Sequence, residues 1–354
     1  MDRSKFRAED SVNSKERLRS ALKGERTDRP LFCPAVYEHK ARLLGKPISE
    51  VSIDAKLIEQ AVLAEYETYG PDMLTVGIDI YNIEAETLGC NVDFPDAPEA
   101  VPTINTRVLT NVDRLESLEP VEPETSGRMP LVLEAAKAVG DKLGDEVFVR
   151  GAISAPCSIA AELVGIEKLI MGMVDQPGEI DKLFRFCGDV CFCYGKAFLD
   201  RGVEVCVFDS YAATPLVSPT IFKDLIFPHV SKLLGRLKKC GAEYIEYVMG
   251  GVTDPIAEYL FDAGSDVVVS DFSSDVDVFL KCAEASGALV RRNVSPVLIE
   301  QGDEDQLREK VNDVLKLAAE NRKVIIGTGA ISYNTPVERM QMITSMCQNF
   351  SQHG

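Results

Sequence analysis

Short apolar runs rich in β-branched residues recur along the chain, and amphipathic stretches of helical spacing separate most of them. Near-continuous apolar strands that alternate with helices indicate a parallel sheet covered by helices on both faces. Eight such units within 354 residues favour an α/β fold closed as a (β/α)8 TIM barrel over an open doubly wound sheet. No glycine-rich dinucleotide fingerprint follows the first run, which weakens the open-sheet alternative further. The predicted strands are residues 31–36, 73–80, 147–153, 203–208, 244–248, 266–270, 288–292 and 323–327.

Two segments lie outside this rhythm. Residues 1–30 contain a basic amphipathic helix at roughly 14–24, which we expect to cap the barrel floor as an N-terminal extension. Residues 90–128 are rich in Pro, Asp and Val, and they predict a hairpin plus loop inserted after the second strand. No break in composition marks a second domain, so we expect residues 31–354 to form one barrel domain.

The chain is acidic, with a net charge of −18 and an isoelectric point near 4.7. This charge opposes binding to nucleic acid and to anionic membrane surfaces. No run of about 18 apolar residues predicts a membrane span, and the charged N-terminus lacks the apolar segment of a signal peptide. The ten cysteines are scattered without a CxxC pair, as expected of reduced thiols. We therefore expect a cytoplasmic protein whose partners are a small molecule or another protein.

In a barrel of this kind the chemistry lies where strands end, at the C-terminal face. Residues just past each predicted strand form a candidate rim that is rich in tyrosine and carboxylate side chains. Strand alternation places Glu246 on one face with Tyr244 and Val248, where we expect it outside the barrel, and it lets at most one of Arg291 and Arg292 face the interior. The rim comprises Tyr37, Glu38, His39, Asp79, Tyr81, Glu84, Ser154, Cys157, Asp209, Tyr211, Tyr247, Met249, Asp271, Asn293 and Tyr333.

Several rim positions also have a purely structural interpretation. Asp79 and Asp209 close apolar strands, where an aspartate often caps the next helix. Glu84 follows its strand by several residues and fits a solvated helix face equally well. A lone His39 near a strand end is more often a hydrogen-bonded structural residue than a ligand. The rim is therefore a set of candidates from which geometry must choose.

Several strand ends resemble one family. The segments KERLRSALKGERTDRPLFCPAV (15–36), GIDIYNIEAETLGCNVDFP (77–95) and RGAISAPCSIAAELVG (150–165) resemble the uroporphyrinogen decarboxylase-like superfamily. VFDSYAATPLVSPTIFKDLIFPHVSKLL, DFSSDVD, RNVSPV and GTGAISYNTPVERMQMI continue the resemblance in the same order to residue 343. It covers nearly the whole chain and itself implies a (β/α)8 barrel.

Within the superfamily, the chain resembles the branch of corrinoid-dependent methyltransferases. IEAETLGC (83–90) is similar to the E-A-E-x-L-G-C of that branch, whereas the Arg-rich W-x-M-R-Q-A-G-R-Y of the decarboxylases is replaced by YEHKARLLGKP (37–47). Without the arginine cluster, the eight carboxylates of uroporphyrinogen have no counter-charge. The resemblance thus implies transfer of a methyl group between a small methylated compound and the cobalt of a corrinoid carried by a separate protein.

The resemblance also implies where a zinc ion would bind in this branch. The family's His-x-Cys and final Cys align with Tyr247, Met249 and Gly329, none of which is a ligand that zinc prefers. We therefore expect no zinc at this site and no metal ligand among the predicted residues. An O-demethylase type of reaction, in which a methyl ether loses its methyl group, fits better than activation of a thiol. Such cleavage needs a proton donor or a Lewis acid for the departing oxygen.

The candidate site follows from the rim and the resemblance together. The corrinoid protein and the small methyl donor or acceptor are the expected partners, and a homodimer is left open. Two alternatives stay open as well: a decarboxylase acting on uroporphyrinogen or a related compound, and a non-catalytic barrel that binds a ligand or a corrinoid protein. The predicted catalytic residues are Glu84, Asp209 and Tyr247, and the predicted substrate-binding residues are His39, Asp79, Tyr211, Met249, Asn293 and Tyr333.

Overall fold

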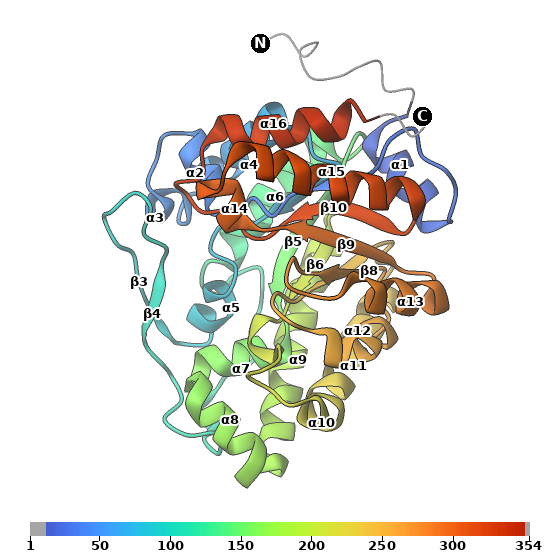
Figure 1. The fold of residues 1–354 in the computed structure, drawn as a ribbon. Helices are drawn as coiled ribbons and strands as arrows, with labels where there is room; N and C mark the ends of the chain where they lie inside the picture. The colour runs from blue at the N-terminus through green and yellow to red at the C-terminus, as the bar shows by residue number, and fades with distance from the viewer. Residues whose placement is uncertain (1–11, 351–354) are drawn as a thin grey trace.

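The computed structural model describes residues 12–350, and its centre is an eight-stranded parallel sheet rolled into a barrel (Figure 1). The strand order is β1-β10-β9-β8-β7-β6-β5-β2, so each neighbour along the chain is a neighbour in space apart from the small hairpin strands. The predicted TIM barrel is confirmed. The strands are β1 (Phe32–Cys33), β2 (Met73–Val76), β5 (Phe148–Ser154), β6 (Glu204–Phe208), β7 (Ile245–Val248), β8 (Val267–Ser270), β9 (Leu289–Val294) and β10 (Val324–Thr328).

The barrel closes between β1 and β2 through Asp72. Its backbone N–H donates to the carbonyl of Phe32 at 2.9 Å, and its carboxylate Oδ2 accepts from the backbone N–H of Phe32 at 2.7 Å. Arg17 and Arg29 donate to the same carboxylate at 2.8 and 2.7 Å, so the charge is compensated. These guanidinium groups oppose the desolvation of Asp72, and the pKa of its carboxyl is lowered.

Helices surround the barrel, and the sequence explains where several of them begin and end. Asp54 caps α4 by accepting from the N–H of Leu57, and Gly70 ends it with φ 50°, a conformation that glycine adopts readily. Gly165, with φ 91°, splits the helix that the pattern predicts over 159–172 into two. The longer helices are α4 (Ala55–Tyr69), α6 (Met129–Leu143), α7 (Pro156–Val164), α8 (Ile166–Asp175), α9 (Pro177–Leu199), α11 (Phe227–Lys239), α13 (Val276–Ser286), α15 (Glu304–Glu320) and α16 (Val337–Gln348).

Shorter helical turns connect these elements. None of the helices within residues 12–350 is long and apolar enough to cross a membrane. The short elements are α2 (His39–Leu43), α3 (Ile48–Val51), α5 (Asn82–Thr87), α10 (Pro219–Ile221), α12 (Ala257–Asp262) and α14 (Pro296–Gln301), the 3₁₀ turns Leu115–Ser117, Ser210–Ala212 and Asp254–Ile256, and a π-helical turn Phe222–Ile226.

The helix predicted near residues 14–24 is α1 (Ser14–Leu22), and it covers the barrel floor. Its N-terminus is a capping box in which Asn13 and Glu16 satisfy each other's backbone N–H groups. Leu18 and Ala21 pack into one apolar cluster with the first residues of several strands, among them Met73 and Phe148. Residues 1–11 of the predicted extension lie outside the described residues, and the division at residue 30 stays a prediction.

The insertion after β2 contains the predicted hairpin. β3 (Asn91–Asp93) and β4 (Thr103–Thr106) pair antiparallel, and Figure 1 shows them as a separate ribbon beside α5. The connection between the two strands carries Val101 and Pro102, which reach the barrel mouth and line the cavity there. The insertion therefore forms part of one wall of the site.

The barrel interior is filled in layers, as closed parallel barrels require. Above the apolar floor lies a polar layer that contains Arg150, Glu246 and Arg291, all of them buried. The expectation that Glu246 faces outward is wrong, because the register of β7 turns it inward and turns Tyr247 toward the helices. The prediction that only one arginine of the 291–292 pair faces the interior is confirmed by Arg291. A third layer opens into the cavity described next: Ala35, Tyr37, Ile80, Ala152, Cys206, Phe208, Val248 and Val269.

Candidate active site

A cavity of about 610 Å³ lies at the C-terminal end of the barrel, where residues past the strand ends converge. Its size is within the range of small-molecule sites. Strands β6, β7, β8 and β9 contribute inward-pointing side chains at their C-terminal ends. The hairpin closes one side of the cavity. The cavity therefore sits where barrels of this class carry their chemistry.

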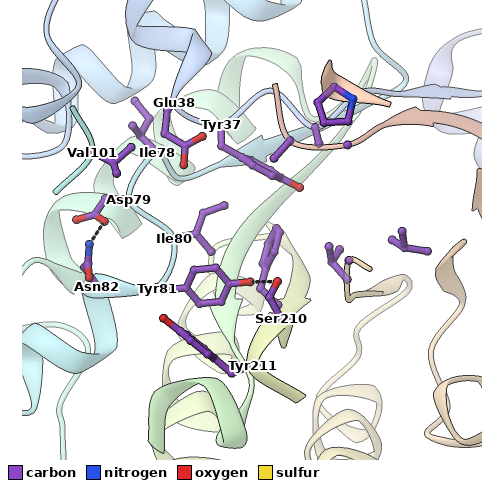
Figure 2. Close-up of a pocket in the computed structure, with 18 of the residues that line it drawn as sticks. Tyr37, Glu38, Ile78, Asp79, Ile80, Tyr81, Asn82, Val101, Ser210 and Tyr211 are labelled. Carbon is purple, nitrogen blue, oxygen red and sulfur yellow. Dashed lines mark hydrogen bonds between the residues drawn. The ribbon is translucent and has the colours of Figure 1, made fainter. Parts of the chain in front are cut away.

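Aromatic side chains form one wall of the cavity. The rings of Tyr37 and Tyr81 both meet Phe208 edge to face, with centroids 5.4 and 6.4 Å away, and Tyr81 meets Tyr211 at 6.0 Å. Figure 2 shows Tyr81 between Tyr37 and Tyr211, with all three rings turned toward the same space. Such a wall favours a flat or apolar ligand.

Two tyrosine hydroxyls in this wall are hydrogen-bonded. Tyr81 and Ser210 share a hydrogen bond of 2.7 Å, and Tyr211 donates to Glu162 at 2.5 Å. Burial raises the pKa of both phenols. Both hydroxyls therefore stay protonated at neutral pH, and Tyr81 in particular can donate to a group bound in the cavity, because its partner Ser210 can itself act as either donor or acceptor.

The floor of the cavity holds polar atoms without a partner among residues 12–350. Among these are the hydroxyl of Tyr37 and the side-chain oxygen of Asn293, both buried. Asn293 donates from Nδ2 to Asp271 at 3.2 Å, which fixes the orientation of its amide. Asp271 in turn accepts from the backbone N–H of Gly251 at 2.8 Å. Buried polar groups left unsatisfied in this way are costly, so they indicate a ligand that would complete them.

Asp79 and Glu38 lie together on the side of the cavity nearest the hairpin, close to Val101 (Figure 2). Asp79 accepts from Arg128 Nη2 at 2.6 Å and from Asn82. Burial raises the pKa of Asp79 in spite of the guanidinium beside it, and burial raises that of Glu38 as well. Asp79 thus lines the cavity and also ties the loop after β2 to Arg128.

The structure brings three of the predicted residues into the cavity wall, namely Asp79, Tyr211 and Asn293. Glu84 is not among them. It lies on α5 behind the wall, where Oε1 accepts from the backbone N–H of Ser154 at 2.6 Å and Oε2 accepts from the Ser154 hydroxyl at 3.2 Å. Burial raises its pKa to about 7. Glu84 therefore holds the end of β5 and does not line the cavity, and its catalytic role stays a prediction.

Asp209 and Tyr247 also lie behind the wall. Asp209 Oδ2 accepts from the Tyr247 hydroxyl at 2.8 Å, while Oδ1 accepts from the hydroxyl and the N–H of Ser158 at 2.8 and 3.2 Å. Burial raises the pKa of Asp209 to about 6. Tyr247 is turned outward by the alternation of β7, and Val248 lines the cavity in its place. The two form a buried cross-link between β6, β7 and α7, one residue away from the cavity-lining Phe208 and Ser210.

His39, Met249 and Tyr333 lie away from the cavity. His39 is fully buried between the Ser332 carbonyl, 2.9 Å from Nδ1, and the Tyr69 hydroxyl, 2.7 Å from Nε2. Burial lowers the pKa of its imidazole to about 4, so it is neutral. Met249 is buried in the core between strands and helices, and Tyr333 packs against that core. For these three residues, the geometry corresponds to the structural interpretation.

Other residues that line the cavity are not among the predicted site residues. Tyr37, Tyr81 and Asp271 follow strands β1, β2 and β8, and their aromatic or acidic character alone did not separate them from their neighbours. Arg107 and Glu162 come from the insertion and from α7, and they sit 3.9 Å apart across the cavity edge. No strand-end rule points to either, because neither follows a strand of the barrel.

The zinc-ligand positions of the resembling methyltransferases do not form a metal site here. The Tyr247 hydroxyl is engaged with Asp209, Met249 is buried in the core, and Gly329 has no side chain. Elsewhere in the described part of the chain, no three His, Cys, Asp or Glu side chains have the arrangement of a metal site. The donor set at these positions does not fit zinc.

The fold and the cavity together define a (β/α)8-barrel protein with a cavity of small-molecule size at its C-terminal mouth. More specifically, the chain belongs to the uroporphyrinogen decarboxylase (URO-D) family, whose model matches residues 13–350. The resemblance seen in the strand-end segments is thereby confirmed.

Relatives of the chain include methyltransferases and uroporphyrinogen decarboxylases. The chain is 25% identical over 346 residues to the methylcobamide:CoM methyltransferase MtbA of Methanosarcina acetivorans, covering 95% of this chain and 98% of the relative. It is 24% identical over 311 residues to a uroporphyrinogen decarboxylase of Prochlorococcus marinus, covering 85% of this chain and 84% of that protein.

Among solved structures, a methyltransferase from Methanosarcina mazei superimposes with a TM-score of 0.82 at 21% identity, covering 95% of this chain and 98% of that one. At this identity the superposition supports the barrel fold alone.

Proposed function

We propose that this protein is a corrinoid-dependent methyltransferase that binds a small methylated compound in the mouth cavity. The observation that carries the proposal is the cavity itself, which is aromatic on one wall, polar at its floor and open at the mouth of the barrel. The similarity to methylcobamide:CoM methyltransferases supports the same class. The donor set at the zinc positions argues against activation of a thiol there, and favours a methyl ether as the compound that is demethylated.

A rim of exposed apolar side chains surrounds the mouth and suits a protein partner. They come from the hairpin, from the loops after β6, β7 and β8, and from α14, and two of them, Val101 and Phe272, also line the cavity. Exposed apolar groups that gather at a site mark an interaction surface more often than scattered ones do. We assign this rim to the docking of the corrinoid protein. Its members are Val101, Leu216, Val252, Phe272 and Val297, between 43% and 65% exposed.

The corrinoid supplies the cobalt centre that accepts the methyl group. The chain's own residues then have two tasks, to hold the methyl–oxygen bond toward the mouth and to stabilise the oxygen that keeps the bonding electrons. The aromatic wall performs the first by stacking on the ligand. The Tyr81 hydroxyl performs the second by donating a hydrogen bond or a proton, because burial keeps it protonated and its partner Ser210 can support it.

The other predicted residues fall into two groups, those that line the cavity and those that hold the cavity-lining residues in place. Asp79, Tyr211 and Asn293 stay proposed as substrate-binding residues because they line the cavity. Glu84, Asp209 and Tyr247 stay proposed as residues on which the rate depends, but as positioning residues that act through Ser154, Phe208 and Ser210. The cytoplasm stays the proposed location, since all ten cysteines, which lie within the described residues, are free thiols.

The test is a methyl-transfer assay with purified protein, a reduced corrinoid protein and a panel of methyl ethers, methylamines and methanol. Loss of the Co(I) absorption band should accompany addition of at least one methyl ether. Tyr81→Phe should lower kcat by about 100-fold or more with a smaller change in KM. Ser49→Ala, at a half-buried position on α3 that does not line the cavity, is the control. Absence of transfer across the panel, together with decarboxylation of uroporphyrinogen, would assign the protein to the decarboxylases instead.

A further inference from the structure

The polar layer under the cavity contains an unequal number of buried charges. The carboxylate of Glu246 forms ion pairs with two guanidinium groups, that of Arg150 and that of Arg291, the latter 2.7 Å from Oε1. All three side chains are essentially inaccessible to solvent. Burial by itself raises the pKa of the Glu246 carboxyl, but the two guanidinium groups outweigh this effect, so its pKa is lowered and Glu246 stays ionised. Two positive charges therefore face one negative charge in the barrel interior.

The neighbouring groups do not remove this excess. Arg150 donates to the Cys33 thiol at 3.1 Å and to the Tyr244 hydroxyl at 3.0 Å. Burial raises the pKa of Cys33, and it raises that of Tyr244, so both are neutral. The next buried cation, Lys40, has its own carboxylate partner in Glu65 at 3.3 Å. An uncompensated charge in such an interior is costly, so an anion that neutralised it would be bound firmly.

Arg291 is the member of this layer that reaches the cavity. Its Nε has no hydrogen-bond acceptor among residues 12–350, and the same is true of the Tyr37 hydroxyl. Both residues line the cavity, so a ligand bound there can complete these hydrogen bonds. The backbone is built to admit the arginine, because a Cβ on Gly327 would lie 2.6 Å from Arg291 Cγ.

We propose that the substrate of this site carries a carboxylate, and that this carboxylate binds at the cavity floor to Arg291 and Tyr37. A single negative charge matches the single excess positive charge, and a planar carboxylate matches the guanidinium group. The proposal rests on the proposed function in calling the ligand a substrate, but the binding of a carboxylate at this place does not depend on that function.

The other charges of the cavity set the direction in which such a ligand lies. Glu38 and Asp79 stand on the hairpin side, and Figure 2 shows the Tyr37 hydroxyl pointing away from them. Asp271 has both carboxylate oxygens occupied by Asn293 and Gly251. A carboxylate is repelled from these positions and drawn to Arg291, which leaves the opposite end of the molecule facing the mouth.

The experiment is isothermal titration calorimetry on the purified chain without any corrinoid protein. Benzoate and its neutral amide, benzamide, have nearly the same shape and differ in charge. Wild-type protein should bind benzoate at least about tenfold more tightly, since a hydrogen-bonded ion pair replaces a neutral contact. Arg291→Met should abolish the preference while leaving Glu246 paired with Arg150. Tyr37→Phe should reduce it, and Arg291→Lys should retain part of it.

Arg107→Met is the matched comparison, because Arg107 is the other arginine that lines the cavity. This variant should keep the preference for benzoate. Loss of the preference in Arg107→Met rather than Arg291→Met would overturn the proposal, and so would equal affinity for the two probes or failure of benzoate to bind folded protein. If Arg291→Met does not fold, as judged by near-UV circular dichroism, Tyr37→Phe decides.

The outcome is separable from that of the methyl-transfer assay. A benzoate preference with no methyl transfer from any ether would leave the carboxylate site standing and refute the proposed function. Methyl transfer from neutral ethers without a preference for benzoate would support the proposed function and refute the carboxylate site.

Discussion

Replacement of Glu84 by glutamine should change how stability depends on pH. Glu84 is fully buried, and its two oxygens face the N–H and the hydroxyl of Ser154. Glutamine has the shape of the protonated side chain and keeps an acceptor for the N–H. Burial raises the pKa of Glu84 from 4.5 to about 7, so the folded protein holds a proton that the unfolded chain releases at lower pH.

The sign of the effect follows from that proton. Between about pH 4.5 and 7 the folded state binds more protons than the unfolded state, so the Glu84 contribution to stability is present below this range and is lost as the pH rises through it. A shift of this size corresponds to about 3 kcal/mol. The free energies of unfolding of wild type and Glu84→Gln should be similar near pH 4.5, and the variant should be the more stable by about 3 kcal/mol near pH 8.

Urea denaturation at a series of pH values measures this difference directly. Other buried carboxylates such as Asp209 titrate in both proteins, so their contribution cancels in the comparison. Glu284→Gln, an exposed substitution on α13, should show the wild-type pH dependence. A difference between wild type and Glu84→Gln that stays constant from pH 4.5 to 8 would refute the reasoning.

Three further changes test the barrel and its rim. Asp72→Asn should lower the free energy of unfolding by about 3–5 kcal/mol in urea denaturation, because the carboxylate shared by two guanidinium groups is lost. An unchanged midpoint would contradict that role. Leu18→Ala should cost about 2–5 kcal/mol by leaving a cavity under the floor, and calorimetry should show the lower Tm. Phe272→Ser should weaken binding of the corrinoid protein about tenfold or more in a titration, whereas Met171→Ser, at an apolar and still more exposed position on α8, should not. Equal effects of the two would remove the rim as a docking surface.

The fold could be predicted from the sequence because apolar strands that alternate with helices indicate a parallel sheet buried on both faces, and eight such units favour a closed barrel over an open sheet. The site could be predicted from the sequence less completely than the fold. Strand ends were located to within about two residues, and the side-chain period of a strand is two, so a shift of one residue exchanges the interior for the exterior. This is what separates Tyr247, predicted at the site, from Val248, which lines it. Asp79 and Tyr211 lie in loops and Asn293 lies near the end of its strand, so a shift of one residue in the predicted strand ends does not remove them from the site.

For cavity residues that do not follow a barrel strand, the sequence offers no pattern comparable to a strand end. Arg107 and Glu162 reach the cavity from the insertion and from α7, and their placement depends on tertiary packing rather than on any local pattern. His39 shows the opposite case, since a residue type associated with catalysis is held between a carbonyl and a phenol away from the cavity. Only the partners of a side chain, which the sequence does not display, separate these two situations.

The closure of the barrel through Asp72 has a consequence for the width of the cavity. Residues 12–350 contain no β-ladder between β1 and β2, and the two hydrogen bonds between Asp72 and Phe32 join them there. Tyr37 follows β1 and Tyr81 follows β2, so the aromatic wall is mounted on both sides of this seam. Because ladders join the other seven pairs of neighbouring strands, we expect the distance between these two rings to be the cavity dimension that changes most easily. Continuous ladders therefore hold most of the barrel around the cavity, whereas the aromatic wall spans the one junction that Asp72 closes.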